Sequence, residues 1–297
     1  MPQPVLTFTA NPLAETTLQL SAPAQLGRTQ RASSRSFQVG GKGFNVAKML
    51  HRLGGDVTAL SFAGGATGEV CRLWLEEYAA FAWELLPLTT PSREGTVVRA
   101  ADGSETTFLG PDCVIDGAAA QAAAARLLSA DPSTTIALCG SVPGWDAPAY
   151  APLRDCFLQQ LAPERLAVDT YGPALVELVQ RPLALVKINR DEFNALADTL
   201  DLPPKLPAMQ RALPVQAWIV TNGGNDIEFA TATTAGTLTP PSVTEVSPTG
   251  SGDVFFATVL AGDWRDDATW PDLLTRAAEL AARNAAHPGI AEFELPA

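Results

Sequence analysis

Short runs of apolar and β-branched residues alternate along the chain with longer segments whose apolar residues recur at helical spacing. The strand-like runs are "VLTFT", "VTALSF", "WELLPL", "TTIALC", "RLAVD", "LALVKI" and "AWIVT". The helix-like segments are "NVAKMLHRL", "EVCRLWLEEYAA", "DGAAAQAAAARLLSA" and "APLRDCFLQQL". This alternation predicts an α/β fold, a mostly parallel sheet with helices on both faces. No repeat period and no linker divides the chain, so we expect one domain over residues 1–297.

Two segments do not follow this alternation of strand-like and helix-like runs. Residues 16–39 and 95–109 are polar and β-prone, and the second is typical of a hairpin turned at Asp102-Gly103. Neither segment has enough apolar residues to be buried on both faces of the main sheet. We therefore expect a small accessory β-sheet, a lid, at its edge, able to close over a substrate, to form a homodimer surface, or both. Residues 201–214 carry four prolines and are expected to wrap the surface.

Charge and composition narrow the class of ligand. The chain has 20 lysines and arginines against 32 acidic residues, a net charge of −12, which disfavours nucleic acid and anionic membranes as partners. Its four cysteines are widely spaced and it has two histidines, so neither a zinc site nor a disulfide framework is expected. No segment approaches the roughly 18 to 20 apolar residues that span a bilayer. These features favour a cytoplasmic protein that captures any anionic ligand locally.

The stretch "SPTGSGDVFFATVL", Ser247–Leu260, places a glycine-rich turn before an apolar helix. A helix start leaves backbone N–H groups unpaired and carries partial positive charge, so the turn from Gly250 to Gly252 is suited to an anion. Asp253, in the first helical turn, is placed to accept a proton from a hydroxyl while the amides stabilise a transferring phosphoryl group. A small-molecule kinase needs this division of labour. Taken alone, the motif also fits a plain tight turn.

A second glycine cluster, "VGGKGFNVAKML", joins a polar segment to a helix. Lys42 lies between Gly41 and Gly43, and the spacing is not that of a Walker loop, in which Ser or Thr follows the lysine. Glycines let a ligand approach the backbone closely, and Asn45 offers a donor and an acceptor to sugar hydroxyls. A packed turn with a solvated lysine is the alternative.

Together, "GGKGFNVAKML" and "SPTGSGDVFFA" resemble the paired signatures of the PfkB (ribokinase-like) carbohydrate kinases, in the expected order and over nearly the whole chain. The start "TANPLAET" looks most like the branch of 1-phosphofructokinases and tagatose-6-phosphate kinases. The resemblance implies a ribokinase-like three-layer α/β/α fold with a β-sheet lid. It also implies phosphotransfer that depends on ATP and Mg²⁺.

The resemblance also implies roles for individual residues. Asp253 matches the family's catalytic base, and Gly250, Ser251 and Gly252 match its anion hole. "VKINRDEF" resembles the Asn-x-x-Glu element, which places Asn189 and Glu192 near the magnesium ion and the phosphates, although by itself it reads as a helix start. The nucleotide side is matched by Thr221, Gly223 and Gly224 in "IVTNGGND", with Lys187 and Asn284 as further candidates.

On the sugar side, Arg31 and Arg93 match positions that hold the substrate's existing phosphate, a task suited to the planar guanidinium. Arg31 belongs to a basic cluster with Arg28 and Arg35, which fits a solvated lid face equally well. The other expected substrate contacts are Glu15, Gly41, Lys42, Asn45 and Ser141. Glu15 stands where the family usually has an aspartate, and "CGSVPGW" is one residue shorter than the common form.

The expected activity is therefore ATP-dependent phosphorylation of a phosphorylated ketohexose: fructose 1-phosphate, fructose 6-phosphate or tagatose 6-phosphate. A kinase of an unphosphorylated sugar or nucleoside is the alternative within enzymes. A non-catalytic sugar-phosphate sensor is the alternative from another class, although binding alone does not require Asp253.

Overall fold

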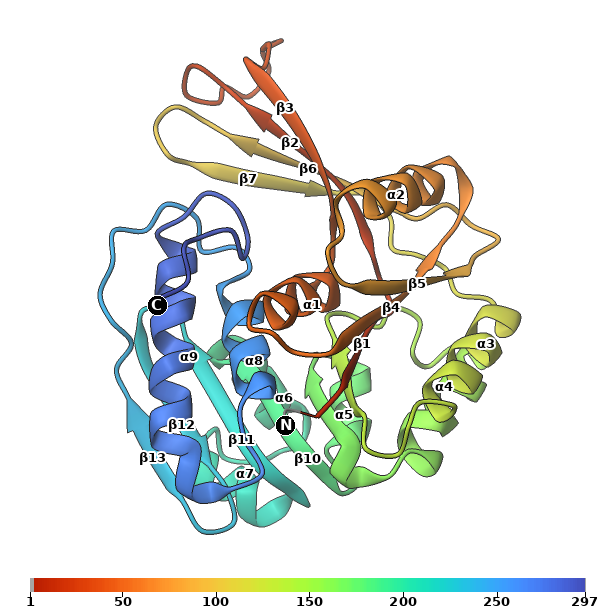
Figure 1. Ribbon diagram of the computed structural model, residues 1–297, viewed down its shortest axis with the longest axis vertical. Helices are drawn as coiled ribbons and strands as arrows, with labels where there is room; N and C mark the ends of the chain where they lie inside the picture. The colour runs from red at the N-terminus through yellow and green to blue at the C-terminus, as the bar shows by residue number, and fades with distance from the viewer. Residues whose placement is uncertain (1–2, 297) are drawn as a thin grey trace.

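A nine-stranded sheet forms the centre of the computed structural model, which describes residues 3–296 (Figure 1). Its strands lie in the order β13-β12-β11-β10-β9-β8-β1-β4-β5. Every pairing from β11 to β5 is parallel, whereas β12 and β13 are antiparallel additions at one edge. The bounds are β1 (Val5–Thr9), β4 (Val57–Ala63), β5 (Ala82–Pro87), β8 (Thr135–Cys139), β9 (Leu166–Asp169), β10 (Leu183–Asn189), β11 (Val215–Asn222), β12 (Asn225–Ala230) and β13 (Ala235–Leu238).

Helices cover both faces of this sheet. One face carries α1 (Lys42–Arg52), α2 (Gly65–Tyr78), α8 (Ser251–Ala261) and α9 (Trp270–Ala285). The other carries α3 (Gly117–Leu128), α4 (Ala151–Asp155), α5 (Pro173–Leu178), α6 (Arg190–Thr199) and α7 (Leu206–Ala212), with a π-helical turn, Cys156–Gln160, continuing α4. The predicted three-layer α/β/α architecture is confirmed.

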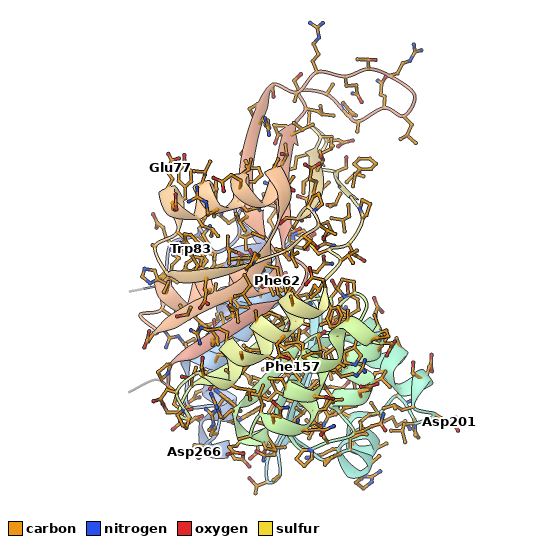
Figure 2. All side chains as sticks on the ribbon, turned by 90° about the vertical axis from the view of Figure 1, so that its right-hand side faces the viewer. Phe62, Glu77, Trp83, Phe157, Asp201 and Asp266 are labelled. Atoms are coloured by element: carbon orange, nitrogen blue, oxygen red, sulfur yellow. The ribbon has the colours of Figure 1, made fainter. Side chains whose placement is uncertain are left out.

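The central strands are apolar throughout because both faces of the sheet are covered. All residues of β1, β8 and β9 are buried, for example. Phe8 packs edge-on against Phe62 at 5.6 Å between ring centroids and lies 6.0 Å from Phe157 on the helical layer (Figure 2). The carboxyl ends of the parallel strands are thereby held in a rigid frame.

The second sheet has four strands in the order β3-β2-β6-β7 and projects from the body as a lid (Figures 1 and 2). Its strands are β2 (Leu13–Gln19), β3 (Ser34–Gly40), β6 (Arg93–Arg99) and β7 (Glu105–Leu109). The hairpin turned at Asp102-Gly103 is confirmed, since β6 and β7 pair antiparallel across it. Residues 13–15 also belong to the lid, three residues earlier than expected.

The expectation for residues 201–214 was wrong. Instead of only wrapping the surface, the segment forms α7, which buries Leu206 and Met209. Pro207 lies in the first turn of this helix, where a missing backbone N–H costs nothing. Between residues 3 and 296, no helix combines the length and apolar character needed to cross a bilayer.

Candidate active site

Polar side chains gather where β8 to β11 end. Cys139 pairs with Asp169 and Asn189 pairs with Thr221, and because these strands are parallel their carboxyl ends meet at one edge of the sheet. A cavity of about 450 Å³ opens there, between the sheet, the lid and the start of α8. Its lining includes Thr9, Asn11, Leu13, Gly41, Lys42, Asn45, Arg93, Leu109, Gly140, Ser141, Tyr171, Lys187, Asn189, Thr221, Thr249, Gly250, Gly252 and Asp253.

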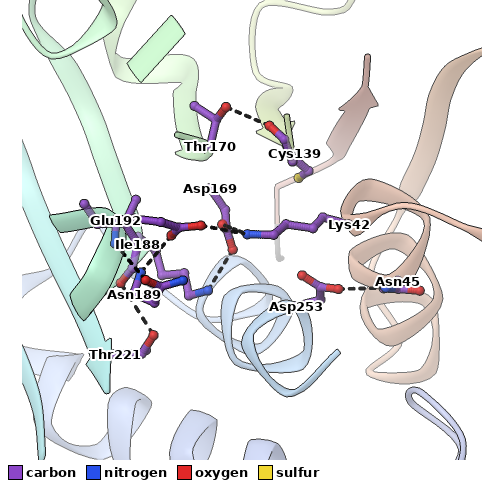
Figure 3. Close-up of polar contacts among 12 residues, drawn as sticks. Lys42, Asn45, Cys139, Asp169, Thr170, Ile188, Asn189, Glu192, Thr221 and Asp253 are labelled. Carbon is purple, nitrogen blue, oxygen red and sulfur yellow. Dashed lines mark hydrogen bonds and ion pairs between the residues drawn. The ribbon is translucent and has the colours of Figure 1, made fainter. Parts of the chain in front are cut away.

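Asp253 lies in the first turn of α8 and is 5 % exposed. The side-chain amide of Asn45 donates a 2.7 Å hydrogen bond to its Oδ2, joining the two glycine-rich motifs across the cavity (Figure 3). Burial raises the pKa of Asp253 to about 6, although the positive charge of Lys42 acts against the shift. At neutral pH the carboxylate is therefore mostly ionised yet close to its pKa, as suits a general base.

Asp169, at the end of β9, bridges two lysines. Its Oδ1 lies 2.7 Å from Lys42 Nζ and its Oδ2 lies 2.7 Å from Lys187 Nζ, and the carboxylate is fully buried (Figure 3). Burial alone would raise the pKa of Asp169, but the two ammonium groups outweigh it and lower the pKa. Burial likewise opposes the charge on Lys42, but nearby carboxylates, Asp169 foremost, raise its pKa. Lys42 is thus held charged, and the one carboxylate of Asp169 holds both lysines at the cavity floor.

Asp169 was not among the residues predicted from the sequence. Its signal was an acidic residue closing a fully buried strand, in "LAVDT". That pattern marks a functional carboxylate only once the neighbouring strands are known to end beside it.

The turn before α8 has a geometry that side chains would disrupt. Gly250 is left-handed, with φ 78°, and a Cβ there would lie 2.4 Å from Ile290 Cγ2. At Gly252 a Cβ would lie 2.8 Å from Lys187 Nζ, so the absent side chain lets this ammonium group approach the backbone. The first-turn amides and Lys187 therefore converge on one anion-binding position.

Asn284 holds this turn from behind. Its side-chain amide donates to Thr249 O at 3.0 Å and to Ser251 Oγ at 3.1 Å, and its Oδ1 accepts from Ala291 N at 2.8 Å. The side chain of Asn284 is buried, and its amide makes all three of these hydrogen bonds. These bonds join the end of α9 to the turn before α8, and a contact of Asn284 with the nucleotide stays a prediction.

A second cavity, of about 310 Å³, adjoins the first. It lies between the β11–β12 hairpin, α8 and α9, and its walls are mainly apolar, including Ile227, Val243 and Phe255. Thr221, Gly223, Gly224, Ser251 and Gly252, all predicted from sequence, line it. Thr221 and Gly252 line both cavities, so the two spaces meet at the anion-binding turn.

Asn189 and Glu192 are joined in a capping box at the start of α6. Glu192 N donates to Asn189 Oδ1 and Asn189 N donates to Glu192 Oε2, both at 2.9 Å, while Glu192 Oε1 lies 3.7 Å from Lys42 Nζ. Across residues 3–296, no three acidic, histidine or cysteine side chains converge as a metal cage. The donors fit Mg²⁺ only as an ion that keeps most of its water and is shared with phosphate oxygens.

At the lid end of the cavity, Arg93 is 13 % exposed. Its two terminal nitrogens make long contacts, 3.3 Å to Asp112 Oδ1 and 3.2 Å to Asn11 O. The Asn11 amide donates to Asp112 Oδ1 at 2.8 Å and to Ser141 Oγ at 2.9 Å. Ser141 thus lines the cavity and is hydrogen-bonded to Asn11. No role was predicted for Asn11, although it belongs to "TANPLAET".

Two predicted sugar-side residues lie elsewhere. Arg31 is exposed in the loop between β2 and β3, which extends away from the body (Figure 2). Glu15, on β2, is buried and accepts a hydrogen bond from Gln38, and burial raises its pKa. Within the described residues, Arg31 and Glu15 line neither cavity. Each belongs to the lid, whose position decides whether its residues reach a ligand.

The sequence of residues 10–297 matches the family that is described as "pfkB family carbohydrate kinase". The chain belongs to this family. It is 32 % identical over 192 residues to the 1-phosphofructokinase of Haloferax volcanii, a match spanning 64 % of this chain and 60 % of that relative. It is also 27 % identical over 270 residues to the tagatose-6-phosphate kinase of Staphylococcus epidermidis, covering 87 % of this chain and 84 % of the relative.

Solved structures show the same fold. The tetrameric inhibited form of phosphofructokinase-2 from Escherichia coli superposes with a TM-score of 0.80 at 21 % identity, over 96 % of this chain and 94 % of that one. The ribokinase of Thermotoga maritima superposes with a TM-score of 0.71 at 17 % identity, over 97 % and 94 %. The chain is therefore a carbohydrate kinase with a ribokinase-like fold.

Proposed function

We propose that this kinase transfers the γ-phosphoryl group of ATP to a hydroxyl of a phosphorylated ketohexose, namely fructose 1-phosphate, fructose 6-phosphate or tagatose 6-phosphate. The observation that carries the proposal is Asp253, a buried carboxylate beside the turn at which two cavities meet. The apolar cavity suits a nucleotide base, and the polar one suits a sugar. Relatives named 1-phosphofructokinase and tagatose-6-phosphate kinase support the substrate class.

In this mechanism Asp253 accepts the proton of the attacking hydroxyl, and Asn45 holds the carboxylate toward the acceptor. The amides of Gly250 to Gly252 and the ammonium of Lys187 stabilise the charge on the transferring phosphoryl oxygens. Asp169 holds Lys42 and Lys187 in place through one contact to each ammonium group. Asn284 acts through its bonds to the turn, as a positioning residue.

Magnesium, when bound, would offset the negative charge of the nucleotide phosphates. Asn189, which lines the polar cavity, and Glu192, joined to it in the capping box, would hold the ion. The lid excludes water, a competing acceptor, from the reacting atoms.

The test is ADP release from magnesium-ATP with the three ketohexose phosphates, free hexoses and nucleosides, for the wild type and Asp253→Asn. The variant should bind ATP but lose about 10²- to 10⁴-fold in turnover, the range for a general base. Asp272→Asn, the same change in the exposed first turn of α9, is the matched control. Near-normal turnover of Asp253→Asn would contradict the base assignment. Turnover only with free sugars or nucleosides would contradict the proposed substrate class. No turnover with any acceptor would favour the non-catalytic sugar-phosphate sensor.

We also propose a homodimer through the lid. Phe108 and Leu109 on β7 are 58 % and 56 % exposed, an unusual apolar surface for a free strand. Sedimentation equilibrium should show a dimer that Phe108→Ser weakens; a wild-type monomer at micromolar concentration would contradict this.

A further inference from the structure

Arg93 is an incompletely satisfied cation. Both of its side-chain contacts exceed 3.1 Å, whereas charged donors and acceptors usually approach to about 2.7–2.9 Å. Its Nε is buried and has no hydrogen-bond partner among residues 3–296. An arginine held this loosely retains hydrogen-bonding capacity for another anion.

Asp112 is the carboxylate that forms an ion pair with Arg93. It lies in the segment between β7 and α3, and its side chain is 55 % exposed. Its Oδ1 receives the short bond, 2.8 Å, from Asn11, and the long one, 3.3 Å, from Arg93. Asp112 is therefore held in place by Asn11 and stays near Arg93 whether or not it bonds to it well.

We propose that Asp112 is a specificity-determining residue that competes with the substrate's phosphate for Arg93. The inference rests on the proposed function, since it requires a phosphorylated acceptor. A phosphate offers oxygens in the paired geometry that a guanidinium binds best, so it displaces a single long contact. The carboxylate of Asp112 then keeps its hydrogen bond from Asn11 and its exposure to solvent, and loses only its contact with Arg93.

This competition has a selective consequence. The cavity floor already holds Lys42 and Lys187 for the transferring phosphoryl group, so an unopposed Arg93 would add a third cation and attract any small phosphate. Asp112 lowers that non-selective attraction. Only a ligand that also fills the sugar contacts at Asn45 and Ser141 then gains enough to displace it.

The experiment compares Asp112→Asn with the wild type, using the ketohexose phosphate on which the wild type is most active. Asparagine keeps the shape and can still accept from Asn11, but it loses the charge. The KM for the sugar phosphate should fall roughly two- to tenfold, with a smaller change in kcat, because a half-exposed ion pair is released. Inorganic phosphate should inhibit the variant at correspondingly lower concentration.

Glu94→Gln is the matched control, because Glu94 is an exposed carboxylate next to Arg93 that does not line the cavity. It should leave both KM and phosphate inhibition unchanged. In an Arg93→Ala background, Asp112→Asn should no longer lower KM, which separates competition from a purely structural effect.

A rise in KM on Asp112→Asn would overturn the proposal, because it would mean that Asp112 itself binds a substrate hydroxyl. An unchanged KM, or the same fall without Arg93, would overturn it as well. Failure of the proposed function is distinguishable, since the wild type would then turn over no sugar phosphate in the same assay.

Discussion

The floor of the site and its lid end are built differently. On the floor, Asp169, its two lysines and the Asn45–Asp253 pair are joined by contacts of 2.7 Å, and both carboxylates are buried (Figure 3). At the lid end, the contacts of Arg93 are long, and Arg31 is exposed. The groups that we propose for phosphoryl transfer are thus preorganised, whereas the groups that we propose select the sugar are left adjustable.

The contrast between the floor and the lid end follows from the free-energy cost of burying a charge. Buried charges are tolerated only when paired and hydrogen-bonded, so the floor must be satisfied within the folded protein. Arg31 on the lid is exposed to water and needs no permanent partner, and Arg93 has only long contacts at the cavity edge. Substrate selection can therefore change with lid residues while the phosphotransfer floor stays intact.

The largest effect on stability should come from removing the carboxylate of Asp169 from the floor. Asp169→Ala leaves Lys187 buried without its partner and removes the short contact of Lys42, so the free energy of unfolding should fall by about 3–5 kcal/mol. Urea denaturation measures it, with Asp198→Ala, an exposed carboxylate on α6, as control. A loss no greater than that of the control would show that the floor is not held by this bridge.

The charge of Asp253 should affect stability and activity in opposite directions. Its folded pKa of about 6 exceeds the ordinary 3.8, so the folded protein binds this proton more tightly than the unfolded chain and gains stability as pH falls from above 6 towards 4. Asp253→Asn should therefore be more stable than the wild type at pH 8, by up to about 3 kcal/mol, and the difference should shrink by pH 5.

Over the same window, wild-type kcat/KM should fall about tenfold per pH unit below the pKa, because the base becomes protonated. Parallel denaturation curves and pH–rate profiles check both halves. A stability difference independent of pH would contradict the burial of this charge.

The smallest effect should come from the contact that joins lid and floor. Thr249 Oγ1, next to Gly250, donates to Glu105 of β7 at 3.0 Å. Glu105→Gln or Thr249→Val should weaken this exposed bond by about 0.5–1.5 kcal/mol and raise the KM for the sugar several-fold. Glu105→Gln also breaks the ion pair of Glu105 with Arg99, so the double variant should cost no more than Glu105→Gln alone; additive losses would mean that the two residues act separately.

Much of the architecture was predictable because it depends on local pattern. Buried strands, helical periodicity and the Asp102-Gly103 turn identified the α/β layers and the lid hairpin. The two glycine motifs identified Asp253 and Asn45, which the fold brings to 2.7 Å although they are 208 residues apart. α7 was missed because the four prolines of residues 201–214 were taken to indicate a segment that wraps the surface, although Pro207 occupies the first turn of a helix.

What the sequence by itself determined is the chemistry each motif can carry: a glycine turn before an apolar helix binds anions, and a carboxylate behind it can take a proton. Only the tertiary structure decided which charges meet. Asp169 joins Lys42 and Lys187 because three segments distant in sequence end at one sheet edge, and Asp112 reaches Arg93 because β7 returns beside β6. Such pairings depend on distances of a few ångströms between separate elements, and local pattern along a chain carries no information on those distances.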